Sequence, residues 1–223
     1  MSGVPDWLRP LVSAVATVRP EQLSRLPPPA RAGRRSAVLV LFGTGARGPD
    51  LLLIERSAAL RSHAGQPAFP GGVLDPGDDG PVAAALREAR EETGLDPAGV
   101  DVLATLPALT VPPSGFVVVP VLAWWRQPSE VGPVDPAEVA AVARVPLAEL
   151  AEPANRVVVR HPSGRTGPAF EVGGLLVWGF TAGLIDRLLA LGGWERPWEP
   201  GPARELPAEV RRLAARPAAG AAS

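Results

Sequence analysis

Three glutamates within five positions form the densest group of side chains in this sequence that could do chemistry. They are Glu88, Glu91 and Glu92 in "ALREAREETGL", residues 85–95. At about 100° per residue, Glu88 and Glu92 stand one helical turn apart on one edge, and Glu91 projects to another side. Two such carboxylates can share a hard divalent cation. They also occur on solvated acidic helices, where their repulsion costs only a few tenths of a kcal/mol, roughly. The helix alone favours the solvated interpretation.

The glutamates lie in the clearest predicted helix, residues 80–93. Pro81 suits its first turn, and Gly94 follows as its stop. A core-facing stripe is formed by Val82, Leu86, Ala89 and Thr93.

One cation on this helix has a predicted partner. Arg87 reaches Glu91 as an i, i+4 pair, whereas Glu88 and Glu92 have no such partner on the helix.

The remaining pattern predicts a mixed fold of strands and helices. Apolar runs at 36–42 and 50–55 predict a β-hairpin, and a long Gly, Pro and Asp-rich stretch separates them from the acidic helix. Further expected elements are strands at 100–106 and 115–125, a short helix at 145–150, a hairpin of 155–161 with 168–172, and a closing amphipathic helix at 181–193. This order predicts an α/β or α+β sandwich.

The chain divides into one domain with extensions. Residues 1–35 suggest a helical appendage ending in a proline-rich linker, 36–198 the domain, and 199–223 a loosely ordered tail rich in Pro, Ala and Arg.

Composition excludes several classes of protein. The 223 residues carry a net charge of -1, which argues against nucleic-acid binding through bulk positive charge, and they contain no cysteine for a disulfide, a thiolate nucleophile or a zinc–thiolate site. No apolar run is long enough to span a membrane, and the first thirty residues lack the pattern of a secretory signal. We therefore expect a cytoplasmic protein.

The stretch "FPGGVLDPGDDGPVAAALREAREETGL" resembles the Nudix box. Its glycine is Gly72, and residues 87–95 match every specified position of the pattern. There are two departures: Asp78 stands where the pattern has glutamate, and eight residues rather than seven separate it from Arg87.

A second resemblance lies upstream. "LLLIERSAALRSHAGQPAFPGG", residues 51–72, is similar to the additional signature of the coenzyme A diphosphatase branch of Nudix hydrolases. The matching residues are Leu52, Leu53, Arg56, Ser57, Arg61, Gly65 and Phe69 to Gly72, with Ile54 in the usual threonine place.

These resemblances imply a Nudix α/β/α sandwich with a mixed sheet and a loop–helix–loop metal site. They make Glu88 and Glu92 the ligands of Mg²⁺ or Mn²⁺. Gly71 and Gly72 let the main chain approach the cation and the substrate closely. The implied reaction cleaves coenzyme A or acyl-CoA into 3',5'-ADP and (acyl-)4'-phosphopantetheine; another nucleoside diphosphate derivative, or a ligand-sensing module without hydrolysis, are the alternatives.

Several roles stay open at the level of sequence. Arg87 is expected to orient Glu91, and the general base is Glu91 or a later acid such as Glu138. Arg56 and Arg61 bind substrate phosphates or brace the long loop.

For several other residues the sequence favours a structural role over a catalytic one. His63, with Gln66, is more typical of a loop hydrogen bond than of acid catalysis, and His161 is assigned no role. The tryptophans favour packing over base stacking. Residues 112–120 line a substrate cleft or simply join a loop to a strand.

Overall fold

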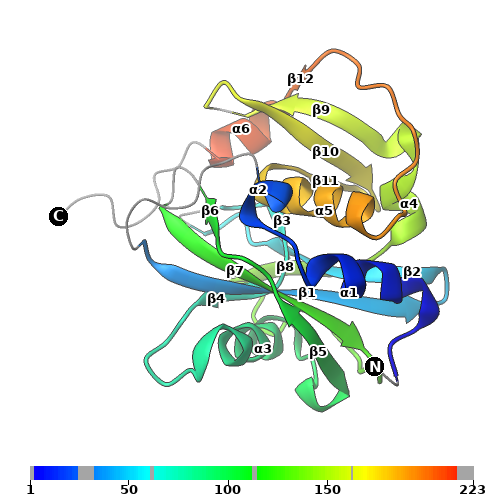
Figure 1. Ribbon diagram of the computed structural model, residues 1–223. Helices are drawn as coiled ribbons and strands as arrows, with labels where there is room; N and C mark the ends of the chain where they lie inside the picture. Colours follow the sequence, from blue (N-terminus) through cyan, green and yellow to red (C-terminus); the bar gives the residue numbers. More distant parts are fainter. Residues whose placement is uncertain (1–2, 25–32, 61–62, 112–114, 162, 215–223) are drawn as a thin grey trace.

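The computed structural model describes residues 3–24, 33–60, 63–111, 115–161 and 163–214 (Figure 1). The strands are β1 (Arg35–Gly45), β2 (Gly48–Arg56), β3 (Pro67–Ala68), β4 (Gly71–Val73), β5 (Val100–Thr105), β6 (Leu109–Val111), β7 (Phe116–Trp125), β8 (Val139–Pro146), β9 (Arg156–Arg160), β10 (Thr166–Val172), β11 (Leu175–Val177) and β12 (Arg204–Glu205). The helices are α1 (Arg9–Val15), α2 (Pro20–Leu23), α3 (Gly80–Thr93), α4 (Leu147–Ala151), α5 (Gly179–Leu191) and α6 (Ala208–Ala214), with single 3-10 turns at Asp6–Leu8, Pro97–Gly99 and Pro153–Asn155.

A mixed sheet forms the centre of the molecule. Within the described residues it has eight strands, with β3-β2-β1-β7-β5 in order and β4, β6 and β8 paired to β1, β7 and β2. β1 runs parallel to β7, and the other pairings of this sheet are antiparallel. The expected hairpin of β1 and β2 and the mixed sheet are confirmed.

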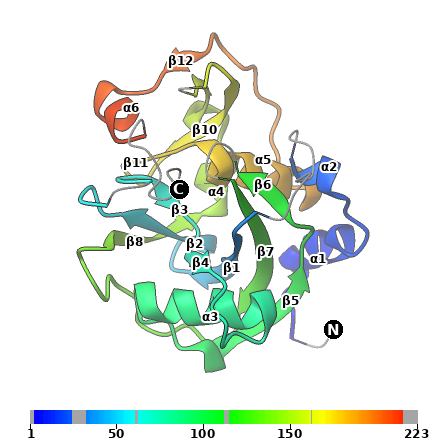
Figure 2. The same ribbon diagram turned by 90° about the vertical axis from the view of Figure 1, so that its left-hand side faces the viewer.

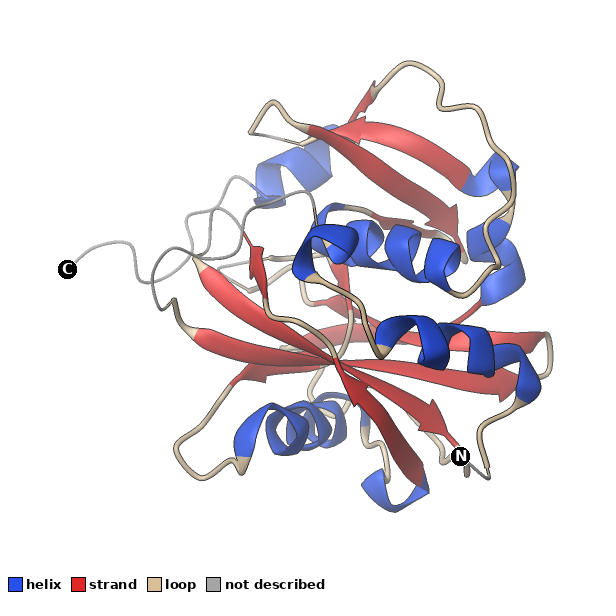
Figure 3. Cartoon of the chain, in the orientation of Figure 1, coloured by secondary structure: helices blue, strands red, loops and turns tan. Residues whose placement is uncertain are grey.

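Alternating side chains divide the sheet into two faces. Along β1, Ala37, Leu39 and Leu41 pack in the cluster that includes α3, whereas Val40 and Phe42 pack in the cluster that includes α1 and α5. This is the period of two expected for a strand buried on both sides. Figures 1 and 3 show α3 on one side of the sheet and α1 and α5 on the other, so the predicted α/β/α sandwich is confirmed.

The first helices belong to the core. Leu8 and Leu11 are fully buried, and Val15 and Leu23 join them in the cluster that contains Leu184 of α5. The predicted short helices are therefore present, but the segment differs from an appendage because its apolar side chains complete one layer of the sandwich.

A smaller sheet lies beyond α5, with strand order β11-β10-β9-β12. The predicted hairpin of β9 and β10 is confirmed. β12 pairs with β9, and Leu206 packs in a cluster with residues of β9 and β10. Residues 204–214 therefore differ from the loosely ordered tail that the composition suggested, because Leu206 packs against the small sheet and Leu213 is also buried.

The sequence pattern did not predict β8 or the strands of two or three residues. β8 pairs along almost the whole of β2, whereas only its last two residues had been assigned, to the start of the helix predicted at 145–150. Within the described residues, no helix is long and apolar enough to cross a membrane.

Candidate functional site

The acidic helix α3 begins and ends where the sequence predicts. Pro81 stands in its first turn, and Gly94 ends it in the left-handed conformation with φ 71°, its N–H donating to the carbonyl of Arg90. Ala89 and Thr93 are fully buried, while Val82 and Leu86 pack partly buried against the same cluster. The predicted stripe thus fixes which edge of α3 carries Glu88 and Glu92.

That edge faces the glycines of β4, which lies against α3 in Figure 2. The N–H of Gly71 donates to Glu92 Oε2 at 2.9 Å. A Cβ placed on Gly72 would lie 2.3 Å from Glu88 Oε1, so the Glu88 carboxyl occupies the space that a side chain would need. β4 pairs with β1, which holds both glycines in place. The structure therefore brings the two predicted ligands together against a main chain free of side chains.

The carboxyl groups of Glu88 and Glu92 both have a raised pKa. Burial raises the pKa of Glu92 to about 7, against the lowering effect of the Gly71 N–H and of Arg56. Burial also raises the pKa of Glu88, and the Arg87 guanidinium opposes this. A cation at this place would favour the ionised form of both groups.

Arg87 links the loop before α3 to the helix itself. Its Nε and Nη2 donate to the two oxygens of Asp78 at 2.9 Å each, and Nη2 also donates to the carbonyl of Val73 at 3.1 Å. The bonds from Arg87, together with the N–H of Asp75, lower the pKa of Asp78. Asp78 is shorter than the glutamate of the family pattern and lies one residue farther from Arg87. Both of its oxygens still bind the guanidinium, in the bidentate geometry that suits arginine.

Arg87 also serves two acids of α3. Nη1 donates to Glu91 Oε2 at 3.0 Å, which confirms the predicted i, i+4 pair, and to Glu88 Oε1 at 3.0 Å. The bond to Glu88 joins direct neighbours in the sequence, so it lies outside the i, i+4 pairs that the sequence prediction considered.

Arg56, from the upstream motif, lies beside the buried acid. Its Nη1 is 3.4 Å from Glu92 Oε1, and its Nε is buried with no hydrogen-bond partner among the described residues. Within the described residues, no side-chain bond from Arg56 to a loop carbonyl is found. Arg61 lies outside the described residues, as do residues 112–114 of the predicted cleft segment.

The loop around Arg56 is held by local bonds. The N–H of Gly65 donates to the carbonyl of Arg56 at 3.0 Å, and the ring Nδ1 of His63 lies 3.1 Å from Gln66 Oε1. His63 has a positive φ of 53°. Its contact is the loop hydrogen bond that the sequence favoured.

Two acids remain candidates for the general base. Glu91 has a 59% exposed side chain that Arg87 orients. Glu138 is exposed, its charge raises the pKa of Glu92, and its carbonyl accepts the N–H of Ser57 at 2.9 Å. The turn that carries Glu138 therefore lies against the Arg56–Ser57 segment. This proximity depends on the pairing of β8 with β2, so it could not be predicted from the sequence.

The donor set suits Mg²⁺ or Mn²⁺. Within the described residues, no three His, Cys, Asp or Glu side chains gather closely enough to hold a metal ion alone. Glu88 and Glu92 would supply two oxygen ligands, and the Gly71–Gly72 main chain approaches them without obstruction. Mg²⁺ is usually bound in this way, with one or two carboxylates and the remaining positions taken by water and substrate phosphates.

The tryptophans pack, as the sequence favoured. Trp7, Trp124 and Trp194 meet with Phe42 in an aromatic cluster with ring centroids about 6 Å apart. Trp198 lies under the guanidinium of Arg156 at 4.6 Å. Trp125 and Trp178 are buried.

Comparison with known families identifies the family of this chain. The family model described as NUDIX domain matches residues 33–163, more than half of the chain. The chain belongs to the Nudix family. Nudix hydrolases act on nucleoside diphosphate derivatives and generally use divalent cations such as Mg²⁺ or Mn²⁺.

Relatives and solved structures agree with this assignment. A protein of Citrobacter koseri named uncharacterized Nudix hydrolase NudL is 43% identical over 171 residues, covering 74% of this chain and 85% of the relative. A NudL of Cronobacter sakazakii is 39% identical over 211 residues, covering 88% and 100%. The crystal structure of RenU, a Nudix hydrolase from M. Smegmatis, has a TM-score of 0.52 at 22% identity over 73% of this chain and 88% of RenU, a likeness of fold.

Proposed function

We propose that this Nudix hydrolase cleaves the diphosphate of coenzyme A or acyl-CoA, giving 3',5'-ADP and (acyl-)4'-phosphopantetheine. The observation that carries the proposal is the position of Arg56. This residue belongs to the motif that resembles the coenzyme A diphosphatase branch, and its guanidinium lies 3.4 Å from Glu92 with a buried, unpartnered Nε. The Arg56 side chain is 27% exposed, and a guanidinium suits a phosphate oxygen of the substrate.

The residues have complementary roles in this proposal. Glu88 and Glu92 hold a divalent cation, which when bound neutralises charge on the diphosphate oxygens. Arg56 binds a phosphate oxygen and so places the diphosphate at the β4 glycines. Gly71 and Gly72 keep that surface free of side chains, because a Cβ on Gly72 would clash with the Glu88 carboxyl.

Water supplies the nucleophile. Its oxygen forms a bond to one phosphorus, the bond from that phosphorus to the bridging oxygen breaks, and the bridging oxygen leaves on the other phosphate. Glu91, oriented by Arg87, or Glu138 accepts the proton from the attacking water. No covalent intermediate with the protein is needed.

Product analysis tests the substrate class directly. The protein is incubated with coenzyme A, NADH and a nucleotide sugar, each with Mg²⁺ or Mn²⁺, and the products are separated by chromatography. The proposal expects 3',5'-ADP and 4'-phosphopantetheine from coenzyme A as the fastest reaction. Preferential cleavage of NADH or of the sugar nucleotide would assign the chain to another substrate, and binding without any cleavage would indicate a ligand-sensing module.

Dephospho-coenzyme A refines the result. It differs from coenzyme A only in lacking the 3'-phosphate, so equal turnover of the two would remove the argument for a site that recognises that group.

A further inference from the structure

Helix α6, near the end of the chain, has one apolar face. Leu206, Val210 and Leu213 follow one another at the i, i+4, i+7 spacing of an apolar helix stripe, and the other side chains of residues 208–212 are exposed. Leu206 and Val210 pack in the cluster of the small sheet. Leu213 is buried as well, and its contact lies with another part of the molecule.

Leu213 packs on the main chain of Gly65. Its Cδ1 lies 2.9 Å from the point that a Cβ on Gly65 would occupy, and within the described residues no other atom beyond the chain neighbours of Gly65 comes within 4 Å of that point. Gly65 has a positive φ of 64°, and His63 has a positive φ of 53°. A residue with a side chain keeps such a conformation only where the surrounding structure holds it. Leu213 is part of what holds this turn.

The same turn fixes the main chain of Arg56. The N–H of Gly65 donates to the carbonyl of Arg56 at 3.0 Å, and the N–H of Arg56 donates to the carbonyl of Gln66 at 3.1 Å. The guanidinium of Arg56 in turn lies 3.4 Å from Glu92. A displacement of Gly65 would therefore move Arg56 relative to Glu92. Direct contacts thus lead from α6 to the acid that is the predicted metal ligand.

Resting on the role that the proposed function gives to Arg56, we propose that Leu213 is a positioning residue for substrate binding. By packing on Gly65 it holds Arg56 where the guanidinium meets a phosphate oxygen of the substrate. α6 lies outside residues 33–163, so the family model does not cover this contact. Figure 2 shows α6 on the same side of the molecule as β3 and β11, and β11 contacts β3. The end of the chain therefore serves the substrate site as well as the fold.

α6 can support the turn because its own start is fixed. β12, directly before it, pairs with β9, and Glu205 Oε1 lies 3.1 Å from Arg160 Nε. The first turn of α6 is closed by the N–H of Arg211, which donates to the carbonyl of Pro207 at 2.9 Å. A substitution at Leu213 leaves all of these contacts in place, so it tests the far end of α6 alone.

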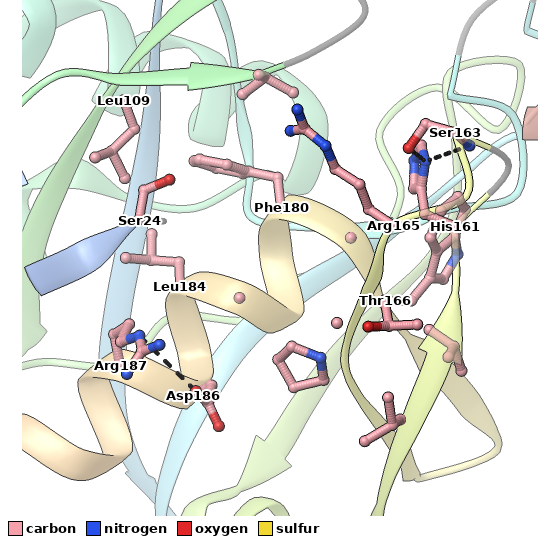
Figure 4. Close-up of a pocket in the computed structure, with 18 of the residues that line it drawn as sticks. Ser24, Leu109, His161, Ser163, Arg165, Thr166, Phe180, Leu184, Asp186 and Arg187 are labelled. Carbon is pink, nitrogen blue, oxygen red and sulfur yellow. Dashed lines mark hydrogen bonds and ion pairs between the residues drawn. The ribbon is translucent and has the colours of Figure 1, made fainter. Parts of the chain in front are cut away.

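A buried leucine elsewhere offers a matched control. Leu184 is 1% exposed, against 8% for Leu213. Figure 4 shows Leu184 on α5, at the wall of a cavity of about 920 Å³, and within the described residues the lining of this cavity includes neither His63–Gln66 nor α6. Because Leu184 is the more buried of the two, its truncation should lower the stability of the protein at least as much as truncation of Leu213.

Hydrogen exchange of the full chain without substrate measures the contact itself. Leu213→Ala removes Cδ1, so we expect the amides of Arg56 and Gly65 to exchange about tenfold faster, with the amides of α3 unchanged as an internal reference. Leu213→Met restores the reach of the side chain and should restore slow exchange. Leu184→Ala should not accelerate these two amides relative to α3. If Leu213→Ala does not fold, exchange in α3 rises too, and Leu213→Val, which loses the same atom but keeps more apolar surface, gives the answer.

Steady-state kinetics separates positioning from stability. Each protein is assayed with Mg²⁺ and the diphosphate substrate that the wild type cleaves fastest. We expect Leu213→Ala and Leu213→Val to raise KM about tenfold and to keep kcat within about twofold, because a bond from Arg56 to a phosphate forms in the ground state and persists in the transition state. Leu213→Met and Leu184→Ala should keep the KM of the wild type.

The outcomes separate this inference from the proposed function. If coenzyme A is cleaved and Leu213→Ala resembles Leu184→Ala in both KM and exchange, Leu213 only stabilises the fold and the inference alone fails. Faster exchange of Arg56 and Gly65 with an unchanged KM would overturn it as well, since substrate binding would not need the support. If NADH or a sugar nucleotide is the preferred substrate and Leu213→Ala selectively raises its KM, the proposed function fails and the inference stands. Cleavage of none of the three substrates would refute both.

Discussion

Replacing Glu92 with glutamine should stabilise the protein when no metal is present. The Glu92 carboxyl is buried, and its pKa is raised to about 7 from an ordinary value of 4.5. At neutral pH and above, folding therefore buries a charge that water would otherwise solvate. Glutamine is neutral and nearly the same size, and its amide oxygen can still accept the N–H of Gly71.

The magnitude follows from the two pKa values. Between 4.5 and about 7 the unfolded chain loses its proton while the folded chain keeps it, so the free energy of unfolding of the wild type falls as the pH rises. At about 1.4 kcal/mol per pH unit, the accumulated loss at about pH 8 is about 3 kcal/mol. Glu92→Gln does not titrate, so it should be more stable than the wild type by about 3 kcal/mol at that pH, and by under about 1 kcal/mol at about pH 5.

Urea unfolding in the presence of a chelator, at both pH values, measures this difference. Glu91→Gln is the control, because its side chain is exposed and its substitution should leave the pH dependence unchanged. Saturating Mg²⁺ should stabilise the wild type, by about 2.7 kcal/mol at one hundred times its Kd, and leave Glu92→Gln unaffected. If Glu92→Gln were less stable than the wild type in the chelator at both pH values, the buried-charge argument would be refuted.

Three further substitutions test other parts of the site and fold. Gly72→Ala should lower Mg²⁺-dependent cleavage and weaken Mg²⁺ binding, since its Cβ would displace the Glu88 carboxyl; unchanged Mg²⁺ titration curves would contradict this. Of Glu91→Gln and Glu138→Gln, the one that removes the general base should lower kcat about 10²- to 10⁴-fold in steady-state assays, and similar small effects of both would exclude the two acids. Leu206→Ala should lower the free energy of unfolding by about 2–5 kcal/mol in urea, because Leu206 is 1% exposed; a near-neutral effect would show that the segment after Trp198 adds little to the fold.

Local features of the site were predictable from the sequence. Helix α3 has the expected bounds because proline, glycine and the apolar period act over a few residues. The pairing of Arg87 with Glu91 and the common edge of Glu88 and Glu92 follow from helix geometry alone. The two glycines of β4 were singled out by their motif, and the structure places them against those acids.

Features that join distant segments were not predictable. The bond from Gly71 to Glu92 and the burial that raises the pKa of Glu92 depend on how β4 packs on α3. The bidentate pair of Asp78 with Arg87 depends on the path of an irregular loop. Glu138 comes close to Ser57 and Glu92 because β8 pairs with β2. The side chains along β8 do not alternate clearly between buried and exposed, so the sequence did not predict this strand.

The early helices have a consequence for how the chain folds during synthesis. Leu8 and Leu11 reach their buried positions only against partners that include Leu184, near the other end of the chain. An N-terminal segment emerging from the ribosome therefore waits, with its leucines exposed, until α5 has been made. Such long-range closure is slow, since the entropy of a large loop is lost before any contact compensates for it. The layer that begins the sequence is thus among the last to be completed, and during that interval the nascent chain is most prone to aggregate.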